Sequence, residues 1–215
     1  MRLSGVVAAA LLMPALCSAQ AGMGEPPSRS DTQAPGWDLS ATGYYYALDN
    51  QSDYLSAIAT ADRDALHLEA RYNYEALDSG SLFAGWRFAG GDALSWEFTP
   101  IIGAVFGDKQ GIAPGFEASL AYGMVDFYIE AEYVRDLELQ ADSFTYAWSE
   151  LGVSPLEWLR FGIVGQRSRA YQSDRDIQRG GFAQLTFGKV TLGAYVFNPD
   201  DSADRFAIFS LGATF

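Results

Sequence analysis

Cysteine, histidine and long hydrophobic runs are scarce in this sequence, and each scarcity excludes a class of protein. Cys17 is the only cysteine. It precedes the predicted mature chain, which therefore has no disulfide, no thiol nucleophile and no cysteine metal site. No stretch beyond residue 21 approaches the roughly 18 apolar residues of a membrane-spanning helix, which excludes a helical membrane protein. His67 is the only histidine, so hydrolase chemistry of the Ser-His type would have to use it.

Basic residues are also few. Removal of Arg2 with the predicted leader reduces the 14 basic residues to 13 against 27 acidic ones, and the net charge becomes −14. Such a charge disfavours nucleic acid and bare anionic surfaces as partners. Aromatic residues make up 14% of the chain, and glycine outnumbers proline by 22 to 8. This composition favours sheet and tight turns over disorder.

The first 21 residues have the pattern of a cleavable signal peptide. Arg2 is followed by an apolar run over residues 6–12 and by small residues at Ala19 and Ala21, which predicts cleavage before Gly22. The run is far shorter than the roughly 20 residues of a membrane span, and the bulky Leu16 argues against a lipoprotein. Residues 22–36 are rich in Pro, Ser and Gly and predict a flexible N-terminal arm in the periplasm.

From Trp37 onward the sequence alternates between apolar and polar residues in about twelve segments. Their centres lie near residues 42, 57, 70, 86, 100, 119, 130, 147, 162, 184, 193 and 210. Each is close to the roughly 9 to 11 residues of a tilted transmembrane strand. Two segments have ambiguous faces, so ten or fourteen strands stay open.

The connections between these segments alternate in length. Tight turns are expected at residues 62–64, 90–92, 123–126, 154–157 and 188–189. Longer, mostly acidic links are expected at residues 48–53, 76–81, 107–113, 136–143, 168–179 and 198–204. Short turns on one side and long loops on the other are typical of outer-membrane barrels whose two chain ends lie in the periplasm.

Three hairpins have a register that pairs apolar residues with one another. About residues 188–189, Phe187 pairs with Val190 and Leu185 with Leu192. About residue 123, the expected pairs are Phe116 with Tyr133, Ala118 with Ala131, Leu120 with Ile129 and Tyr122 with Phe127. About Arg63, they are Ala59 with Leu68 and Leu55 with Tyr72. Random alternation would rarely give three consistent apolar faces.

The last eleven residues, 205–215, form an amphipathic strand that stops on phenylalanine. Ala207, Phe209, Leu211, Ala213 and Phe215 share one face. Such a strand resembles the assembly signal of Gram-negative outer-membrane β-barrel proteins of the porin-like superfamily. The resemblance implies an all-β fold, a closed antiparallel up-and-down transmembrane barrel over residues 37–215. It also implies contact with outer-membrane lipid and lipopolysaccharide, and recognition of the terminal strand by the barrel-assembly machinery.

Alternation alone does not distinguish this barrel from a soluble exported β-sandwich, because both have one apolar face. Aromatic residues near the ends of the apolar faces favour the membrane, since they form interfacial girdles. They are Trp37, Tyr45, Tyr72, Tyr74, Trp96, Phe106, Phe116, Tyr133 and Phe215. Small residues at mid-strand, such as Ala57 and Ala118, are tolerable against lipid but poor filling for a sandwich core.

With the apolar faces outward, the polar positions line the lumen. The predicted lining residues are His67, Glu69, Arg71, Asn73, Arg87, Glu97, Glu117, Glu130, Glu132, Arg160 and Gln184. Arg87 and Glu97 flank a turn within pairing reach. Glu117 is expected opposite Glu132, which is costly unless an arginine, a cation or a proton relieves the repulsion. Glutamates outnumber arginines about two to one, so the lumen should disfavour anions.

The predicted function is a small porin-like channel for passive diffusion of small neutral or cationic solutes. The alternative is a plugged structural or adhesion-type barrel with acidic extracellular loops, because a lumen of twelve strands is either open or filled. A lipid-modifying hydrolase using His67 ranks third, since His67 is expected near the periplasmic rim, facing Thr60, and not at the outer leaflet. The acids at Asp174, Asp176, Asp200, Asp201 and Asp204 match no calcium motif. No cofactor and no metal are predicted.

Overall fold

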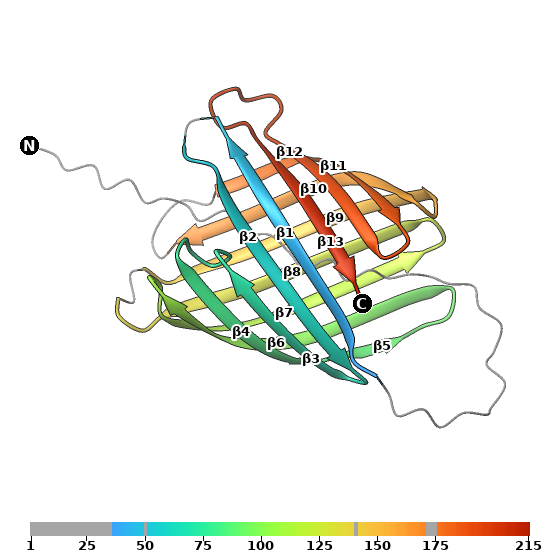
Figure 1. Cartoon of the computed structure of the whole chain (residues 1–215), viewed down its shortest axis with the longest axis horizontal. Helices are drawn as coiled ribbons and strands as arrows, with labels where there is room; N and C mark the ends of the chain where they lie inside the picture. Colours follow the sequence, from blue (N-terminus) through green and yellow to red (C-terminus); the bar gives the residue numbers. More distant parts are fainter. Residues whose placement is uncertain (1–35, 50, 140–141, 171–175) are drawn as a thin grey trace, which may run out of the picture.

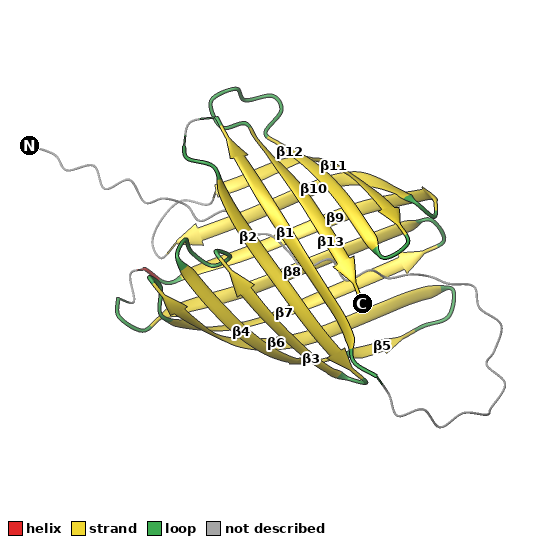
Figure 2. Ribbon diagram, in the orientation of Figure 1, coloured by secondary structure: helices red, strands yellow, loops and turns green. Residues whose placement is uncertain are grey.

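The computed structural model describes residues 36–215 apart from residue 50, residues 140–141 and residues 171–175. The predicted signal peptide and nearly all of the predicted arm lie outside these residues, so those boundaries stay predictions. The described residues form a single antiparallel sheet that closes on itself (Figures 1 and 2). They contain no helix long and apolar enough to cross a bilayer.

The strands follow one another along the chain as the alternating segments predict. They are β1 (Asp38–Leu48), β2 (Tyr54–Arg63), β3 (Leu66–Tyr72), β4 (Ser79–Trp86), β5 (Phe88–Gly90), β6 (Leu94–Gly107), β7 (Gly111–Tyr122), β8 (Val125–Asp136), β9 (Phe144–Leu156), β10 (Leu159–Ala170), β11 (Asp176–Phe187), β12 (Val190–Phe197) and β13 (Phe206–Thr214). Alternating apolar residues, many of them β-branched or aromatic, suit extended strands that are apolar on one face.

The barrel closes through the first and last strands. β1 pairs with β13, from Ser40 opposite Thr214 to Leu48 opposite Phe206. The two strands run side by side across the face shown in Figure 1. Every other pair of neighbours in the wall is consecutive along the chain, except that β4 as well as β5 pairs with β6. The predicted pairing of the terminal strand with both β12 and β1 is confirmed.

β4 and β5 together occupy the position of one strand in the barrel wall. Both pair with β6 in the same register, β4 through Gly85 opposite Ile101 and β5 through Phe88 opposite Phe98. That register places Trp86 opposite Pro100, which has no N–H to donate, and this explains the interruption. Counted this way, the wall has twelve strands, as the sequence predicts.

All the tight turns lie at the end of the barrel where β1 begins and β13 ends. They occupy residues 64–65, 91–93, 123–124, 157–158 and 188–189. At the same end, the Phe215 N–H donates to the Leu39 carbonyl at 2.9 Å. The opposite end carries the connections 73–78, 108–110 and 198–205, the described parts of 49–53 and 137–143, and the facing ends of β10 and β11. Residues 108–110 are fewer than expected, because strand pairing continues to Val105 opposite Gly111.

One predicted register is confirmed and two are wrong by two residues. Phe187 pairs with Val190 and Leu185 with Leu192, as expected. Leu120, however, pairs with Phe127 and Ala59 with Ala70. Both hairpins use two-residue turns whose first residue has a positive φ, 54° at Asp64 and 59° at Gly123. Such turns match the twist of the strands better than the longer turns expected.

The wall is apolar on its outer face. Its exposed large side chains include Leu55, Leu82, Ile102, Leu120, Ile163, Phe187, Leu192, Phe209 and Leu211. An exposed apolar surface of this extent is what a transmembrane barrel presents to lipid. The predicted girdle aromatics are exposed, apart from the half-buried Phe116 and from Tyr74. Tyr74 is a correction: it is 1% exposed, because β3 ends at Tyr72 and Asn73 has a φ of 51°.

A hollow of about 470 Å³ lies on the wall at β1, β2, β3 and β13. It is lined by Ala41, Thr42, Gly43, Ala57, Ile58, Ala59, Ala70, Arg71, Tyr72, Leu211, Gly212 and Ala213. Most of these side chains are small and belong to the outer face. The hollow therefore reflects missing side-chain volume on the lipid-facing surface, and the polar residues of interest lie on the other side of the wall.

Candidate functional site: the barrel interior

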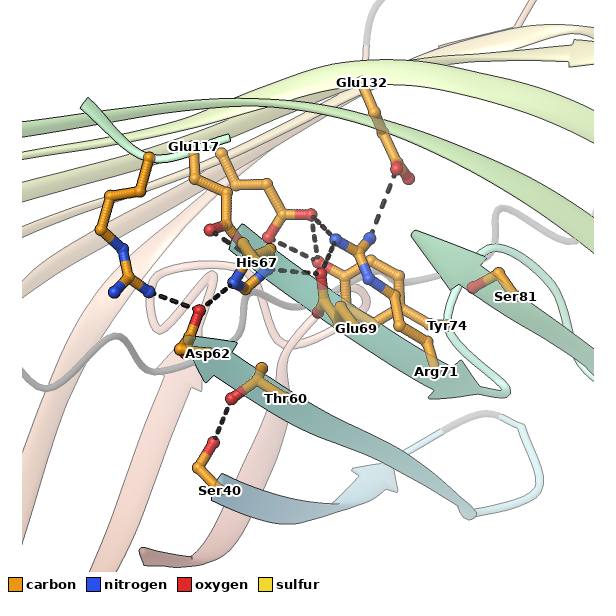
Figure 3. A network of polar contacts seen from close by, with 12 residues as sticks. Ser40, Thr60, Asp62, His67, Glu69, Arg71, Tyr74, Ser81, Glu117 and Glu132 are labelled. Atoms are coloured by element: carbon orange, nitrogen blue, oxygen red, sulfur yellow. Dashed lines mark hydrogen bonds and ion pairs between the residues drawn. The ribbon is translucent and has the colours of Figure 1, made fainter. Parts of the chain in front are cut away.

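The interior holds a buried cluster of charges around Arg71, which lies on β3 (Figure 3). We call Arg71, Glu69, Glu75, Glu130 and Glu132 the Arg71 cluster. Its guanidinium lies 2.8 Å from Glu69, 2.9 Å from Glu130, 3.3 Å from Glu132 and 3.6 Å from Glu75. All five side chains are completely buried, so their charges interact in a medium of low dielectric.

Aromatic rings and hydroxyl groups hold this cluster in place. The Arg71 guanidinium lies 4.3 Å from the ring centre of Tyr74 and 4.2 Å from that of Phe83, within the range of cation–π contact. The Tyr74 hydroxyl donates to Glu130 at 3.0 Å, and the Ser81 hydroxyl donates to Glu75 at 2.7 Å. The inward turn of Tyr74 thus supplies both a ring and a hydrogen-bond donor to the cluster.

A second group of charges surrounds His67 near the tight-turn end of the barrel. His67 Nδ1 lies 2.8 Å from Asp62, which also accepts from Arg87 at 2.5 Å. Arg87 lies 3.2 Å from Glu97, which confirms the predicted pair. His67 is opposite Asp62 and not Thr60, because the turn is shorter than expected. Thr60 instead pairs with Ser40, at 2.7 Å between hydroxyl oxygens (Figure 3).

A third group, the Arg160 cluster, joins β8 to β11. Arg160 donates to Asp126 at 2.5 Å, to Glu150 at 2.6 Å and to Gln184 at 3.0 Å. Gln184 in turn donates to the Tyr195 hydroxyl at 2.7 Å. These bonds connect the inner faces of β8, β9 and β11 through Arg160. They also supply hydrogen-bond acceptors to a guanidinium group whose side chain is only 19% exposed.

Carboxylates dominate the buried charges of the described residues. Among residues whose burial is described, the buried acidic ones are Glu69, Glu75, Glu117, Glu130, Glu132, Asp136 and Glu150, whereas Arg71 is the single buried arginine. Arg87, Lys109 and Arg160 are partly buried and pair with Asp62, Asp136 and Asp126. The interior therefore has more acidic than basic side chains, and when ionised the acids attract cations and repel anions.

Much of the interior is filled by buried rings, which we call the aromatic cluster. Its members are Tyr44, Tyr46, Tyr74, Tyr128, Tyr146, Trp148, Phe182, Tyr195, Phe197 and Phe206, all buried. Phe197 stacks on Phe206 with ring centres 4.8 Å apart, and Trp148 meets Phe197 edge-on at 5.3 Å. Side chains thus fill much of the barrel, as is common when the strand number is small.

The sequence prediction missed most of this cluster because it assigned most apolar residues to the outer face. Strict alternation would have found it: Tyr44 and Tyr46 follow the inward Thr42, and Phe206 and Ile208 precede the inward Ser210. The interior therefore holds aromatic rings beside the Arg71 cluster, and Tyr74 belongs to both.

The predicted lining residues occupy three kinds of position. His67, Glu69, Arg71, Glu117, Glu130, Glu132 and Gln184 are buried, and Arg87, Glu97 and Arg160 are half-buried. Asn73 is a correction, because it lies beyond β3 and holds the loop by donating to the Leu55 carbonyl and accepting from the Asp78 N–H. Glu117 is opposite Glu130 and not Glu132, a consequence of the two-residue turn.

The acidic loop residues form no cluster within the described residues. Asp200 accepts from Arg179 at 2.7 Å, and this hydrogen bond holds the pKa of Asp200 below its usual value. Asp201 accepts from the N–H of Ala203. Asp174 lies outside the described residues, as does the side chain of Asp176.

These features define a transmembrane antiparallel β-barrel with an acidic, partly filled interior. Solved structures of the same fold include the KdgM porin, with a TM-score of 0.59 and 10% identity over 82% of this chain and 99% of that one. The NanC porin matches with a TM-score of 0.57 and 11% identity over 82% and 98% of the two chains. KdgM porin in complex with disordered oligogalacturonate gives 0.56 and 7% over 83% and 99%. No family model and no curated protein sequence matches the chain. The chain has the fold of these small porins.

Proposed function

We propose that this protein is a small outer-membrane channel through which neutral or cationic solutes diffuse passively. The observation that carries the proposal is the acidic interior of a closed transmembrane barrel. Glu69, Glu130 and Glu132 all converge on Arg71, so acidic side chains along the path outnumber basic ones. A pore wall rich in carboxylates favours cations. The porin fold of the structural neighbours supports passage as the role of such a barrel.

The cargo of the neighbours does not transfer to this chain. One KdgM porin structure holds oligogalacturonate, a sugar oligomer that carries one carboxylate per unit. Buried carboxylates such as Glu117 and Glu150 would repel such a chain. We therefore expect a cation or an uncharged small molecule, and not an acidic oligosaccharide.

The aromatic cluster limits the size of the solute and supports a second candidate function. Tyr46, Trp148 and Phe197 are completely buried and touch their neighbours across the interior. Solutes pass only if these rings leave or open a narrow path. If they do not, the protein is a plugged barrel that presents its acidic loops to the medium.

Ion conductance in planar bilayers distinguishes the two functions. The purified chain should conduct, and under a potassium chloride gradient its reversal potential should show preference for potassium. Glu132→Gln should reduce this preference, because it removes one interior carboxylate. Glu138→Gln, at an exposed loop position, should leave it unchanged. A correctly folded but silent protein would support the plugged barrel, and a preference for chloride would contradict the proposal.

We further propose outer-membrane lipid, lipopolysaccharide and the barrel-assembly machinery as partners. The apolar outer face and the terminal strand ending in Phe215 support them. The hydrolase alternative has no support in the described residues, because no serine or threonine hydroxyl hydrogen-bonds to His67 Nε2. Lipid A and phospholipid profiles should accordingly be the same for the wild-type protein and His67→Ala, and a change in either would revive that alternative.

A further inference from the structure

Three potential metal ligands converge inside the barrel from two strands that are not neighbours. His67 and Glu69 lie on β3 and Glu117 on β7, and one nitrogen or oxygen from each lies within 4.8 Å of the others. We propose that His67, Glu69 and Glu117 bind one divalent transition-metal ion. This site does not depend on whether the interior conducts.

The ligand atoms are available for a metal. His67 is 4% exposed, and its Nε2 atom makes no hydrogen bond with any described residue. It points between the two carboxylates, 3.7 Å from Oε2 of Glu69 and 3.9 Å from Oε2 of Glu117. A buried nitrogen without a partner is costly. A metal ion between these groups would provide the missing partner.

In Glu117 the oxygen that faces His67 differs from the one that accepts from Tyr128, whereas in Glu69 the oxygen that faces His67 also accepts from Arg71 and the other oxygen has no hydrogen bond. Oε2 of Glu69 accepts from Arg71 at 2.8 Å, whereas its Oε1 is buried without a hydrogen bond. Oε1 of Glu117 accepts from the Tyr128 hydroxyl at 3.3 Å, which leaves Oε2 facing His67. Arg71 and Tyr128 therefore orient the carboxylates without consuming both oxygens.

Asp62 positions the imidazole for metal binding. It accepts from His67 Nδ1 at 2.8 Å, so in the neutral imidazole that binds a metal the ring proton lies on Nδ1 and the lone pair of Nε2 faces Glu69 and Glu117. Metal-binding histidines almost always donate their other ring N–H to a carboxylate, a carbonyl or water. The pair Asp62–His67 has this arrangement at the tight-turn end of the barrel.

The distances suit a small ion. Zinc binds nitrogen and oxygen ligands at about 2.0 to 2.2 Å, so neighbouring ligand atoms of a tetrahedral site lie roughly 3.3 to 3.6 Å apart. The present separations of 3.7 and 3.9 Å from His67 Nε2 exceed these values slightly. Small rotations of the Glu69 and Glu117 side chains would close both differences.

Charge and ligand chemistry define the class of ion. Around the site, the acidic residues are Asp62, Glu69, Glu75, Glu97, Glu117, Glu130 and Glu132, and the guanidinium groups are those of Arg71 and Arg87. A divalent ion offsets part of this excess. The imidazole ligand selects ions such as zinc, cobalt or nickel, whereas magnesium and calcium prefer sites made of oxygen alone.

Cobalt(II) chloride titrated into the purified, metal-free barrel in detergent tests the site directly. We expect one equivalent to bind with the visible absorption bands of a low-coordinate cobalt ion, and zinc chloride to displace it. His67→Gln and Glu117→Gln should abolish the bands. Asp62→Asn should weaken binding by about 10- to 100-fold, as expected for loss of the group that orients a ligand.

Glu150→Gln is the matched control, because it removes a buried carboxylate of the Arg160 cluster and should retain one equivalent of cobalt. Heat-modifiable gel mobility shows whether each variant is folded. If the wild-type protein gives only the spectrum of hydrated cobalt, the proposal is wrong regardless of the variants. It is also wrong if folded His67→Gln binds cobalt as the wild-type protein does, which would place the ion on the acidic loops.

Discussion

Arg71 and Glu130 lie 2.9 Å apart although their strands, β3 and β8, are not neighbours in the wall. Both side chains are completely buried. The contact therefore crosses the interior and ties two parts of the barrel that backbone pairing does not join. Glu132 on the same strand reaches Arg71 as well, at 3.3 Å.

Replacement of Arg71 by methionine should destabilise the barrel strongly. It would leave three glutamates, Glu69, Glu130 and Glu132, buried without their common cation, and loss of one partner of a buried ion pair costs about 3 to 5 kcal/mol. The free energy of unfolding in denaturant, measured in detergent or lipid, should fall by about this amount. Arg205→Met is the control, because its pair with Asp49 is long and exposed and contributes less than about 1 kcal/mol. Equal losses in both variants would contradict the role of Arg71.

Trp148→Ala should increase the conductance of the barrel, because Trp148 is completely buried between Tyr195 and Phe197. The change should also reduce stability by about 3 to 5 kcal/mol, as for other buried tryptophans. Single-channel recordings of folded protein measure the first effect. Trp96→Ala, on the outer face, should leave conductance unchanged. No increase in Trp148→Ala would show that the aromatic cluster does not limit the path.

The strands were predictable because each carries one apolar face. The register in which neighbouring strands pair was predictable for only some of the hairpins. A shift of two residues preserves the face of every side chain. Alternation therefore could not reveal that Leu120 pairs with Phe127 and not with Ile129. Only the turn decides this, and the hairpin about residues 188–189 was right because its two-residue turn was recognised.

Engineered cysteines test the register that closes the barrel. Ala41 lies directly opposite Ala213, and opposite residues of antiparallel strands have Cα atoms about 4.5 to 5.5 Å apart, within disulfide range. Ala41→Cys with Ala213→Cys should cross-link under mild oxidation, as seen by gel mobility. Ala41→Cys with Leu211→Cys shares the face but is shifted by two residues, and should cross-link far less. If the pair at residues 41 and 211 cross-linked more than the pair at residues 41 and 213, the register between β1 and β13 would be wrong.

The loop after β1 should loosen in acid. The Tyr45 hydroxyl donates to Asp53 at 2.5 Å and the Leu48 N–H at 3.0 Å, and these bonds hold the pKa of Asp53 below its ordinary value. A lowered pKa means that the stabilisation is present above the ordinary value of about 3.9 and is lost as the pH falls through the lower, folded value. Hydrogen exchange at the Leu48 amide should accelerate over that range relative to a remote amide. Asp53→Asn should remove this pH dependence, and an unchanged profile in that variant would refute the link.

The candidate site was less predictable than the fold. His67 and Glu69 share a face two residues apart, which the sequence shows, but nothing in it brings Glu117 from β7 beside them. That juxtaposition arises from curvature of the closed wall. For the same reason, the sequence predicted repulsion between Glu117 and Glu132 but not that Arg71 would be the cation beside Glu132.

The seam between β1 and β13 gives this barrel an unusual folding problem. All other neighbours along the wall form by local hairpins, whereas the seam joins residues 40–48 to residues 206–214. Local hairpins form quickly, but a contact of such sequence separation carries the full loop-closure entropy. The seam should therefore set the folding rate. In a circularly permuted chain, the new ends would lie within residues 198–205 and a short linker would join β13 to β1. The pairing of β1 with β13 should then form as a local hairpin, and the slow step should become the pairing of β12 with β13.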